Sequence, residues 1–421
     1  MQNVFSDLKA RGLIHSVTDE KLLAELLQSQ SVCFYIGFDP TAPSLHIGNL
    51  VQIITAKRLQ LAGHKPLALV GGATGLIGDP KQSGERVLNE REVVDQWVKR
   101  IHDQLTNFFD FAGTNAAIMV NNYDWTAPVG VLEFLRDIGK HFPVNKMLDR
   151  EAVAARLAKD GISFTEFSYQ VLQANDFLHL FQNYGAVLQT GGSDQWGNLT
   201  AGTDLIRRVT GASVHAMCTP LLVKADGGKF GKTESGTIWL DSEMTSPYAF
   251  YQFWINTDDR DLELMLKTFS LKSLSEIEQL MNISNAEPHL RHGQKALAME
   301  MTSLVHSEQA MLDAQNAASA LFAGGDLSDI NKSTLHAALQ EAGLAKSILI
   351  NNQMPSVVEL LLSSGVVGSK NEAKRAISEG SIWINQTRIS TEDQAVAVSE
   401  LIHGAYLVVR KGKKTIRGLE F

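Results

Sequence analysis

The sequence has few cysteines, with only Cys33 and Cys218 among 421 residues. These two lie far apart, no C-x-x-C pair occurs, and no group of cysteines and histidines has the spacing of a zinc site. A small secreted fold held together by disulfides is therefore excluded, and no structural metal is implied. We expect reduced thiols in a cytoplasmic protein.

Long apolar stretches are also missing. The uncharged run Pro66 to Gly78 is rich in glycine and too short to span a bilayer. The first residues include Asp7, Lys9 and Arg11 and lack the apolar core of a signal peptide. The sequence predicts neither membrane insertion nor export.

The chain has no overall positive charge, because 38 Lys and Arg residues oppose 46 Asp and Glu residues and give a net charge of −8. This balance argues against a general nucleic-acid binder. The charge is uneven, however. Residues 354–421 contain nine basic and seven acidic side chains, a balance of +2, which leaves −10 on residues 1–353. A small basic module is therefore joined to an acidic body.

What the chain does have is apolar content, at 44% hydrophobic and 20% charged residues. A globular chain of this length can bury large cores, and we expect two to four domains of roughly 100–200 residues each.

One strand-turn-helix stretch organises the chain. Residues 32–36 are short, β-branched and aromatic, which predicts a buried strand. Gly37, Pro40 and Pro43 should end that strand and prevent an early helix, so a helix is expected from about Ile47. In open α/β sheets ligands bind where a strand of this kind gives way to its helix.

His46 and Asn49 lie on the first turn of this expected helix. Their side-chain donors would point the same way as the free N–H groups and the positive dipole end of the helix. A triphosphate suits such a place. The alternative is an ordinary connection in which His46 only caps the helix.

A second segment far downstream bears on that choice. Residues 229–233 read Lys-Phe-Gly-Lys-Thr and lie in a loop, residues 224–236, that contains four glycines. A mobile loop that carries ammonium groups suits a charge that appears only transiently. The alternative is a solvated basic loop.

Together, the His46-Ile47-Gly48-Asn49 and Lys229-to-Thr233 segments resemble the "HIGH" and "KMSKS" signatures of class I aminoacyl-tRNA synthetases. The surrounding sequence is similar to the bacterial-type tyrosyl-tRNA synthetase family over nearly the whole chain, most clearly in residues 69–80, 164–169 and 191–198. The chain departs from that pattern at Asn49, at Ile36 and in a short loop over residues 81–86.

The elements between these motifs predict an open parallel sheet. An amphipathic helix should follow Asp19, and strands are expected over residues 66–71, 116–121 and 186–190, with a helix capped by Asn89 between the first two. A right-handed β-α-β crossover would join the first strands. Residues 122–125, Asn-Tyr-Asp-Trp, follow a strand on the ligand side of the sheet.

Tyr169, Gln173 and Asp176 stand at i, i+4 and i+7 of a helix that Thr165 should begin, so they share one face. Alone, the pattern is also that of a solvent-facing polar stripe. The apolar residues around them leave no clear alternative core face, which favours a binding surface. Residues 130–185 are expected to be mostly helical.

The rest of the chain predicts a helical region and then a small mixed domain. Ser246 and Pro247 should start helices that run to about residue 322, with a flexible join over 345–353. Two S-x-x-E capping boxes, at Ser356 and Ser369, predict two short helices, and Asn385-Gln386 predicts the turn of a hairpin, with a later strand over residues 407–410.

The predicted fold class is α/β: a Rossmann-like parallel-sheet catalytic domain, an all-helical domain and a small α+β RNA-binding domain. The expected bounds are 1–240, with a helical dimerisation insertion, 241–345 for the helical domain, 346–353 for the linker and 354–421 for the last domain. That last domain resembles the alpha-L RNA-binding motif. A solvated basic face with a disordered terminus is the alternative for it.

The resemblance implies a tyrosine-tRNA ligase that forms tyrosyl-adenylate from L-tyrosine and ATP with Mg²⁺, and then charges the 3′ end of tRNA(Tyr). It implies no permanently bound cofactor, no protein metal site, a cytoplasmic homodimer and no membrane partner. The residues implied for catalysis are Thr41, His46, Asn49, Lys229, Lys232 and Thr233. Those implied for tyrosine are Tyr35, Asp79, Tyr169, Gln173 and Asp176. Those implied for ATP are Gly37, Asp39, Gly48, Gly192, Asp194 and Lys232, with Lys81 and Arg86 on a mobile loop. Those implied for tRNA are Lys370, Lys374, Arg375, Lys411, Lys413 and Lys414.

Two rival functions stay open at this point. A tryptophanyl-tRNA synthetase or a small nucleotidylyltransferase would share the strand-His-x-Gly-helix element, but neither accounts for Tyr35 together with Asp176 or for the RNA-binding tail. A non-catalytic RNA-binding protein on a synthetase scaffold would show damaged lysines or helix residues at the ATP site, and these residues are present.

Overall fold

The computed structural model describes residues 3–80, 84, 87–148, 151–159, 161–228, 230–233, 236–323, 325–412 and 415–421. The chain forms two compact units, the first with residues 1–241 and 258–293 and the second with residues 242–257 and 294–421. The domain boundaries expected at 240, 345 and 353 stay a prediction.

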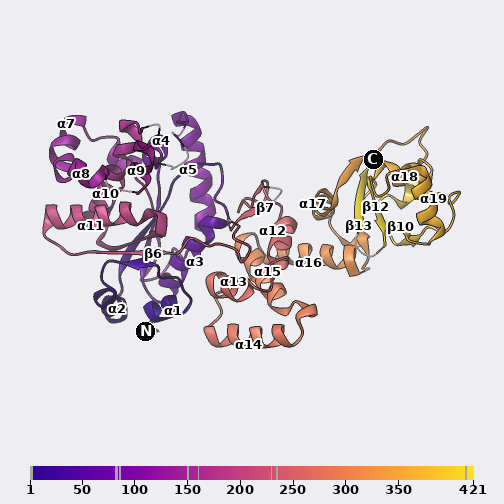
Figure 1. Ribbon diagram of the computed structural model, residues 1–421, viewed down its shortest axis with the longest axis horizontal. Coiled ribbons are helices and arrows are strands. Elements are labelled where there is room, and N and C mark those ends of the chain that lie inside the picture. Colours follow the sequence, from indigo (N-terminus) through magenta and orange to yellow (C-terminus); the bar gives the residue numbers. More distant parts are fainter. Residues whose placement is uncertain are drawn as a thin grey trace. The chain divides into compact units, whose positions relative to one another are not determined.

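The first unit is built on a six-stranded sheet (Figure 1). Its strands are β1 (Ser16–Val17), β2 (Cys33–Phe38), β3 (Lys65–Val70), β4 (Ile118–Asn121), β5 (Ala186–Gly192) and β6 (His215–Thr219). They lie in the order β1-β6-β5-β2-β3-β4, and every pair is parallel except β1 with β6. The parallel sheet expected from the sequence is therefore confirmed.

Strand β2 is longer than expected, because Gly37 does not end it. Gly37 pairs with Leu69 and Phe38 pairs with Val70, so the parallel ladder with β3 continues for two more residues. The pairing with β3 keeps Gly37 in the strand, although a glycine has no side chain to pack there.

The helices follow their local signals closely. The helix α2 (Glu20–Ser29) begins after Asp19, whose side chain accepts from the N–H of Leu22, and α3 (Ile47–Leu61) begins where it was predicted. The expected cap Asn89 is wrong, because α5 (Arg91–Thr106) is preceded by Glu90 and has no side-chain cap. The helix α10 (Phe164–Tyr184) starts one residue before Thr165, and Ser163 caps it. The remaining long helix of the sheet region is α11 (Trp196–Thr210).

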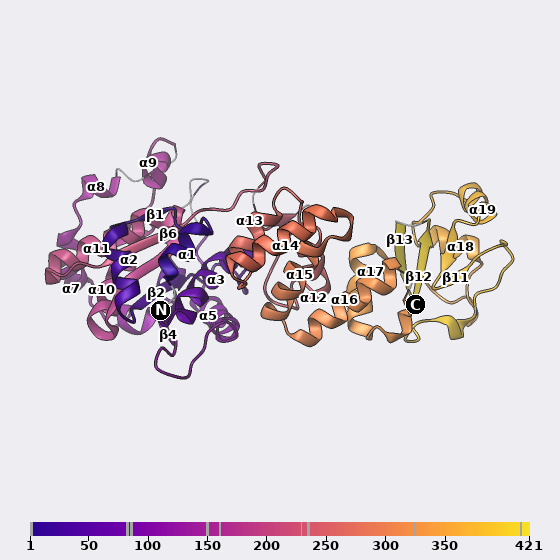
Figure 2. The same ribbon diagram turned by 90° about the horizontal axis from the view of Figure 1, so that it is seen from below.

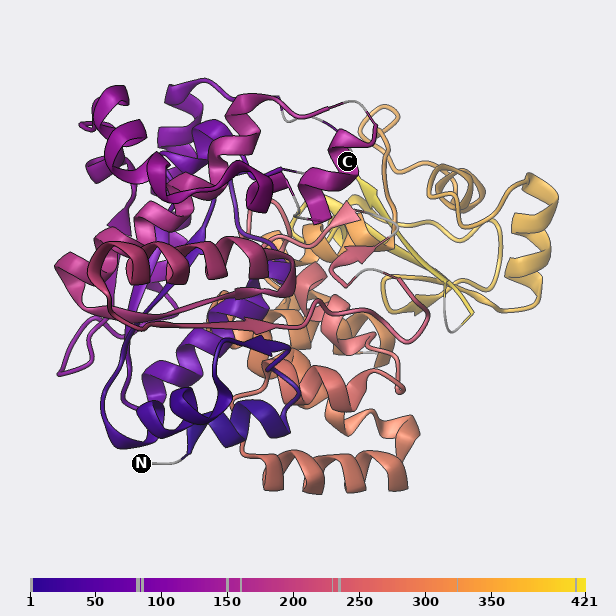
Figure 3. The same cartoon turned by 60° about the vertical axis from the view of Figure 1, so that its left-hand side comes forward.

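Short helices fill the segment before α10. They are α6 (Tyr123–Thr126), α7 (Val131–Glu133), a π-turn over Phe134–Ile138, a 3₁₀ turn over Gly139–His141, α8 (Val144–Leu148) and α9 (Glu151–Leu157). The helices α7 to α9 lie at the opposite end of the first unit from α1 (Val4–Ala10) and α2 (Figures 1 and 3). The mostly helical character expected for residues 130–185 is confirmed in the described part.

The apolar core beside β2 sets which face of α10 packs against the sheet. Tyr35, Leu67 and Leu69 of the sheet pack in one cluster with Ala174 and Phe177 of α10. All five residues are at most 3% exposed. Burial of these apolar side chains fixes the rotation of α10 about its axis.

Four further elements of the first unit follow the sheet. The strands β7 (Lys232–Thr233) and β8 (Gly236–Thr237) form a small antiparallel pair. The helices α13 (Leu262–Phe269) and α14 (Leu274–Ala286) come later, and a complete capping box at Ser273 starts α14.

The second unit has helices and then a mixed sheet. The helices before its sheet are α12 (Pro247–Ile255), α16 (Glu308–Ala323) and α17 (Lys332–Ala342), while α15 (His292–Val305) begins at the end of the first unit. Ser246 caps α12 with Pro247 in its first turn, as predicted. None of the described helices is both long and apolar enough to cross a membrane.

The C-terminal sheet contains β9 (Leu344–Lys346), β10 (Ile382–Ile384), β11 (Thr387–Arg388), β12 (Tyr406–Lys411) and β13 (Thr415–Glu420), in the order β11-β10-β12-β13-β9. The helix α17 lies on one side of it, and α18 (Val357–Ser363) and α19 (Lys370–Ser378) lie on the other (Figure 2). Strand β9 runs parallel to β13, so the expected linker 346–353 begins inside a strand.

The predicted hairpin is confirmed, with Asn385 at a positive φ of 52° between β10 and β11. The capping box at Ser356 is also confirmed. The second box is only half formed, because Ser369 accepts from the N–H of Glu372 while the Glu372 carboxylate accepts from the N–H of Gly368.

Candidate active site

A cavity of about 440 Å³ opens at the carboxyl ends of β2 and β5. These strands are neighbours, but the chain leaves β2 toward β3 and leaves β5 toward β6, in opposite directions across the sheet. Such a switch point leaves a crevice between the two departing connections, which is where open α/β sheets bind ligands. The structure therefore places a pocket where the strand-turn-helix stretch predicted one.

Most of the site residues expected from the sequence line this one cavity. They are Tyr35, Gly37, Asp39, Thr41, His46, Gly48, Asn49, Asp79, Tyr169, Gln173, Asp176, Gly192 and Asp194. Tyr169, Gln173 and Asp176 face it together from α10, as their spacing predicts.

The first turn of α3 forms one wall of the cavity. The Nδ1 atom of His46 accepts the N–H of Gly48 at 3.0 Å, and Oδ1 of Asn49 accepts the N–H of His46 at 3.0 Å. The plain capping role of His46 is thus present, and it does not compete with a ligand role. A neutral imidazole that accepts at Nδ1 carries its proton on Nε2, and the Asn49 amide keeps its NH₂ group as a donor.

Asp176 occupies the buried end of the cavity and is 2% exposed. Its Oδ2 accepts from Nδ2 of Asn122 at 2.9 Å, and its Oδ1 accepts from Nε1 of Trp125 at 2.9 Å. Burial raises the pKa of Asp176 to about 7, and the two donors oppose that rise by stabilising the carboxylate.

Tyr35 lies in the same buried region, 1% exposed. Its hydroxyl has no hydrogen-bond partner among the described residues. Burial, and then the negative charge of Asp176, keep the pKa of Tyr35 well above its ordinary value, so the phenol stays a hydrogen-bond donor. A buried donor without a partner next to a carboxylate suits a ligand hydroxyl.

A chain of hydrogen bonds joins Tyr169 to Asp176. The Tyr169 hydroxyl donates to Oδ2 of Asp39 at 2.6 Å, and Oγ1 of Thr74 donates to Oδ1 of Asp39 at 2.7 Å. The second N–H of the Asn122 amide reaches Oγ1 of Thr74 at 3.0 Å. The Asp39 side chain therefore joins the two ends of the pocket, whereas the resemblance implied Asp39 for ATP.

Asp79 is held from the other side of the cavity. It accepts from Nε2 of Gln195 at 2.9 Å and from Nδ2 of Asn198 at 3.1 Å. Two amide donors fix the direction of its carboxylate.

Several polar residues of the pocket were missed from the sequence. Thr74, Asn122, Trp125 and Gln195 make the contacts above, and the position of residues 122–125 after β4 was the only signal for two of them. Among the described residues the side-chain oxygens of Gln52, Gln173, Gln189 and Thr190 are buried and unpartnered in this cavity. Ligand donors would satisfy them.

The structure does not describe some of the predicted site residues, or describes only their backbone. Lys81, Arg86, Lys229, Lys413 and Lys414 lie outside the described residues. Lys232 and Thr233 form β7, and only their backbone is described. Next to them Gly231 has φ of +82°, and a Cβ there would stand 2.5 Å from Cγ2 of Ile47, so the loop meets α3 at a point that only glycine fits.

The basic residues predicted for RNA belong to the second unit. Lys370, Lys374 and Arg375 lie on α19, and Lys411 ends β12. Lys374 pairs with Glu392 at 2.8 Å and Lys411 with Glu372 at 2.5 Å. Solvent-accessible ion pairs of this kind contribute little to stability, so phosphate groups can replace the carboxylates.

The described residues hold two cysteines but no cluster of typical metal-ligating side chains. Within the described ranges no group of three His, Cys, Asp or Glu residues is arranged to hold a metal ion. Cys33 and Cys218 are free thiols, and burial raises the pKa of Cys33 to about 11 and that of Cys218 to about 12. Neither is a ready nucleophile at neutral pH.

The fold and the pocket define a class of protein. The family model "tRNA synthetases class I (W and Y)" matches residues 28–323, which contain the whole sheet apart from β1 and all the lining residues of the cavity. A second model, the "Tyrosine--tRNA ligase SYY-like C-terminal domain", matches residues 339–417. This is a class I aminoacyl-tRNA synthetase fold.

Relatives narrow the class. A "Tyrosine--tRNA ligase" of Streptomyces avermitilis is 54% identical over 100% of this chain and 99% of its own length, and one of Streptomyces coelicolor is 51% identical over the same shares. The chain belongs to the tyrosyl-tRNA synthetase family. The family expected from the sequence is therefore confirmed.

Solved structures agree with this assignment. A C-terminally truncated mitochondrial tyrosyl-tRNA synthetase of Aspergillus nidulans has a TM-score of 0.70 at 31% identity, covering 76% of this chain and 95% of that one. A tryptophanyl-tRNA synthetase of Encephalitozoon cuniculi, at 13% identity and a TM-score of 0.52, covers 79% of this chain and 91% of that one and shows a shared fold alone.

Proposed function

We propose that this chain activates L-tyrosine with ATP, forming tyrosyl-adenylate and pyrophosphate, and then transfers the tyrosyl group to the 3′ end of tRNA(Tyr). The observation that carries the proposal is the buried end of the cavity, where the unpartnered hydroxyl of Tyr35 and the carboxylate of Asp176 line the same space. A phenol O–H can donate to Asp176 and accept from Tyr35. Phenylalanine could do neither, so the pair selects tyrosine.

The substrate ammonium group would lie toward Asp79, Tyr169 and Gln173. Asp79 is oriented by two amides, and Oε1 of Gln173 is a buried acceptor without a partner in the described chain. A charged ammonium donates three N–H bonds, which matches a carboxylate, an amide oxygen and a phenol oxygen. The substrate carboxylate then points away from this end, toward the first turn of α3.

ATP would bind along the first turn of α3 and the end of β5. Thr41, His46 and Asn49 supply donors for phosphate, and Gly192 and Asp194 line the cavity where a ribose could lie. The tyrosine carboxylate is already a nucleophile, so attack on the α-phosphorus needs alignment and stabilisation of charge on the leaving pyrophosphate. Lys229, Lys232 and Thr233 would contribute to that stabilisation from their loop.

Magnesium would arrive with the nucleotide. The phosphate side of the cavity has hydroxyl, imidazole and amide groups from Thr41, His46 and Asn49. These groups can donate hydrogen bonds to phosphate, but they do not form a set of oxygen ligands around an ion. Mg²⁺ commonly keeps several waters and binds substrate phosphates directly, which fits this set of residues.

The second unit would bind tRNA through its C-terminal sheet domain. Lys370, Lys374, Arg375 and Lys411 are in place for phosphate contacts, with Lys413 and Lys414 next to them in sequence. Phosphate contacts are sequence-independent and weaken with salt, so base recognition needs other contacts.

The working form would be a cytoplasmic homodimer. Apolar side chains of the segment before and at the start of α10 are exposed in the single chain, among them Val131 (71%), Leu132 (80%), Val144 (59%) and Phe164 (76%). Clusters of exposed apolar side chains mark interfaces, and a second copy of the chain would cover these.

Pyrophosphate exchange into ATP, tested with each standard amino acid, examines the proposal. Exchange should depend on tyrosine, with phenylalanine and tryptophan supporting little. Equal exchange with tryptophan, or none with any amino acid, would contradict it. A tRNA charging assay on the same preparation separates the second step from the first.

A further inference from the structure

Helix α13 supports the lysine-containing loop at two points. At the start of the loop the N–H of Ala225 donates to Oδ1 of Asp261, immediately before α13, at 2.8 Å. Five residues later the ring of Phe230 stacks on Phe269 at the other end of α13, with centroids 5.3 Å apart and planes 26° apart. The loop therefore contacts this helix at Ala225, beside its start, and at Phe230, at its end.

The other edge of the loop is held directly by the start of α3. The N–H of Ile47 donates to the carbonyl of Ile238 at 2.9 Å, and the N–H of Leu240 donates to the carbonyl of Leu45 at 2.9 Å. The segment that follows the loop thus has its own attachment to the His46 turn. The contacts of Ala225 and Phe230 depend instead on the position of α13.

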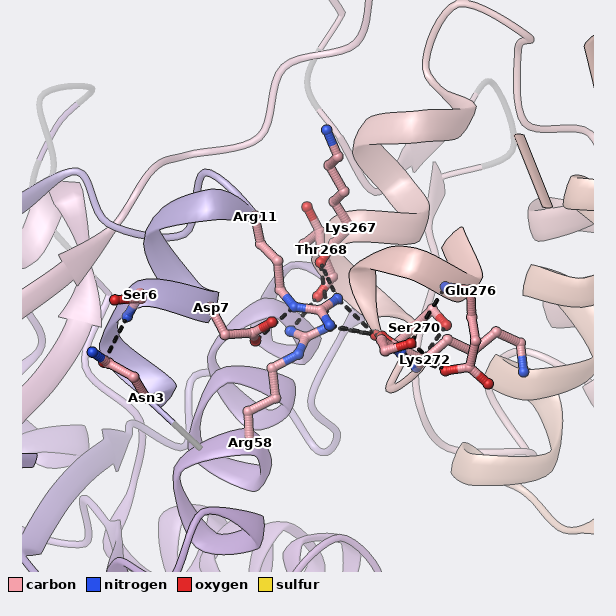
Figure 4. Close-up of polar contacts among 11 residues, drawn as sticks. Asn3, Ser6, Asp7, Arg11, Arg58, Lys267, Thr268, Ser270, Lys272 and Glu276 are labelled. Carbon is pink, nitrogen blue, oxygen red and sulfur yellow. Dashed lines mark hydrogen bonds and ion pairs between the residues drawn. The ribbon is translucent and has the colours of Figure 1, made fainter. Parts of the chain in front are cut away.

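Arg58 fixes α13 to α3. It lies in the last turn of α3 and is 6% exposed. Its guanidinium donates to the carbonyl oxygens of Thr268 at 2.7 Å, Lys267 at 3.2 Å and Ser270 at 2.5 Å (Figure 4). Carbonyls at the end of a helix have no partners within the helix and carry partial negative charge, so a buried cation suits them.

Arg11 makes nearly the same contacts from a different element. It belongs to the end of α1, where Asp7 accepts from its Nε at 2.8 Å, and its terminal nitrogens reach the carbonyls of Lys267 at 3.2 Å, Ser270 at 3.4 Å and Lys272 at 2.7 Å. Figure 4 shows the two guanidinium groups converging on the same turn. The two arginines thus stabilise the end of α13 alike, but only Arg58 stands on the helix that begins at His46.

We infer that Arg58 is a positioning residue for the activation step. Through α13 it keeps Ala225 and Phe230, and with them the first half of the lysine-containing loop, in register with the donors of His46 and Asn49. An α-helix of 15 residues is stiff, so α3 transmits the position of Arg58 to its first turn. Arg58 does not line the substrate cavity and would act only through this contact.

The inference separates two kinetic parameters. The inference rests on the proposed function, in which tyrosine binds at the buried end of the cavity. No residue of α13 lines that cavity, so the KM for tyrosine should not change when Arg58 is lost. Charge on the pyrophosphate develops only in the transition state, so a misplaced loop should lower kcat.

Arg58→Met, with Arg11→Met as its matched control, tests the inference in tyrosine-dependent pyrophosphate exchange. Methionine keeps an apolar chain of similar length and removes all three hydrogen bonds. We expect Arg58→Met to lower kcat at least tenfold with the KM for tyrosine within about twofold, and Arg11→Met to lower kcat less than about threefold. Thermal unfolding of both variants measures the loss of stability. If Arg58 had a purely structural role, its replacement would lower stability and leave kcat unchanged.

Equal kcat for the two variants at equal loss of stability would overturn the inference, and so would a rise in KM with kcat unchanged. If Arg58→Met does not fold, Phe269→Leu provides a second test. This variant removes the ring on which Phe230 stacks and keeps a buried apolar side chain. Phe269→Leu should also lower kcat with KM unchanged. An unchanged kcat in that variant would equally overturn the inference.

Discussion

The indole N–H of Trp125 donates to Oδ1 of Asp176 at 2.9 Å, and this bond turns the carboxylate toward the buried end of the cavity. Trp125 also stacks on His179, with ring centroids 4.3 Å apart and an interplanar angle of 10°. The stack holds the indole flat and so fixes the direction of its N–H. Trp125 thereby orients the carboxylate that we propose as the acceptor for the substrate phenol, without needing to touch the substrate.

Trp125→Phe should shift the pH dependence of tyrosine use. The pKa of Asp176 is about 7, so kcat/KM for tyrosine should fall as pH drops below that value and the carboxylate is protonated. Phenylalanine at position 125 removes a donor that stabilises the carboxylate, which raises the pKa of Asp176 and moves the fall to higher pH. A pH profile of pyrophosphate exchange measures the midpoint. The same midpoint in both proteins would contradict the assigned role of Trp125.

Tyr35→Phe should reduce the preference for tyrosine over phenylalanine about tenfold. The variant removes one hydrogen bond to the substrate phenol, and one such bond contributes about 1 to 1.5 kcal/mol. The measurement is kcat/KM for both amino acids in exchange. Loss of activity toward both to the same degree would place the phenol elsewhere.

Glu166→Ala should destabilise the first unit by about 3–5 kcal/mol. Glu166 pairs with Arg156 at 2.9 Å, and both side chains are at most 2% exposed, so the variant leaves a buried guanidinium without its carboxylate. Urea unfolding measures the loss. The double variant Arg156→Met with Glu166→Leu is the control, and it should recover most of the stability because no buried charge remains.

Lys232→Ala should lower kcat of activation by about 10²–10³, the usual effect of removing one group that stabilises transition-state charge. The KM for tyrosine should change little, since a cation on this loop meets extra charge only in the transition state. Steady-state exchange kinetics separate the two parameters. A raised KM with an unchanged kcat would make Lys232 a ground-state binding residue instead.

Removal of residues 344–421, which include all five strands of the C-terminal sheet, should spare tyrosine-dependent exchange and abolish tRNA charging. The cavity lies wholly within the first unit, so its residues are retained. In the full chain, tRNA binding should weaken steeply as salt rises. A truncated protein that is folded by circular dichroism but inactive in exchange would show that the C-terminal sheet is needed for adenylate formation.

The sequence specified the elements whose signals are local. The turn of Gly37, Pro40 and Pro43 is followed by a helix at Ile47, and the i, i+4, i+7 spacing places Tyr169, Gln173 and Asp176 on one face. These features depend on backbone dihedral limits and on the period of a helix, which neighbouring residues determine. The resemblance added the roles of the two signature segments, which spacing alone left open.

Local signals failed where a neighbour in space decided the outcome. Gly37 stays in β2 because it pairs with Leu69 of the neighbouring strand β3. The Glu372 carboxylate turns to the N–H of Gly368 and also pairs with Lys411, a residue 39 positions away. A capping signature shows which hydrogen bonds can form at the start of a helix. Tertiary contacts decide which of these bonds do form.

Only the tertiary structure decided which polar side chains meet. Tyr169 donates to Asp39 across 130 positions, and Arg58 reaches carbonyls more than 200 positions downstream. Such contacts follow from the strand order β5-β2-β3 and from the packing of α13, because burial forces each polar group to find a partner among whatever the fold brings near. The sequence by itself determined the local elements and the family, and the long-range packing determined how the carboxylates of the pocket are held.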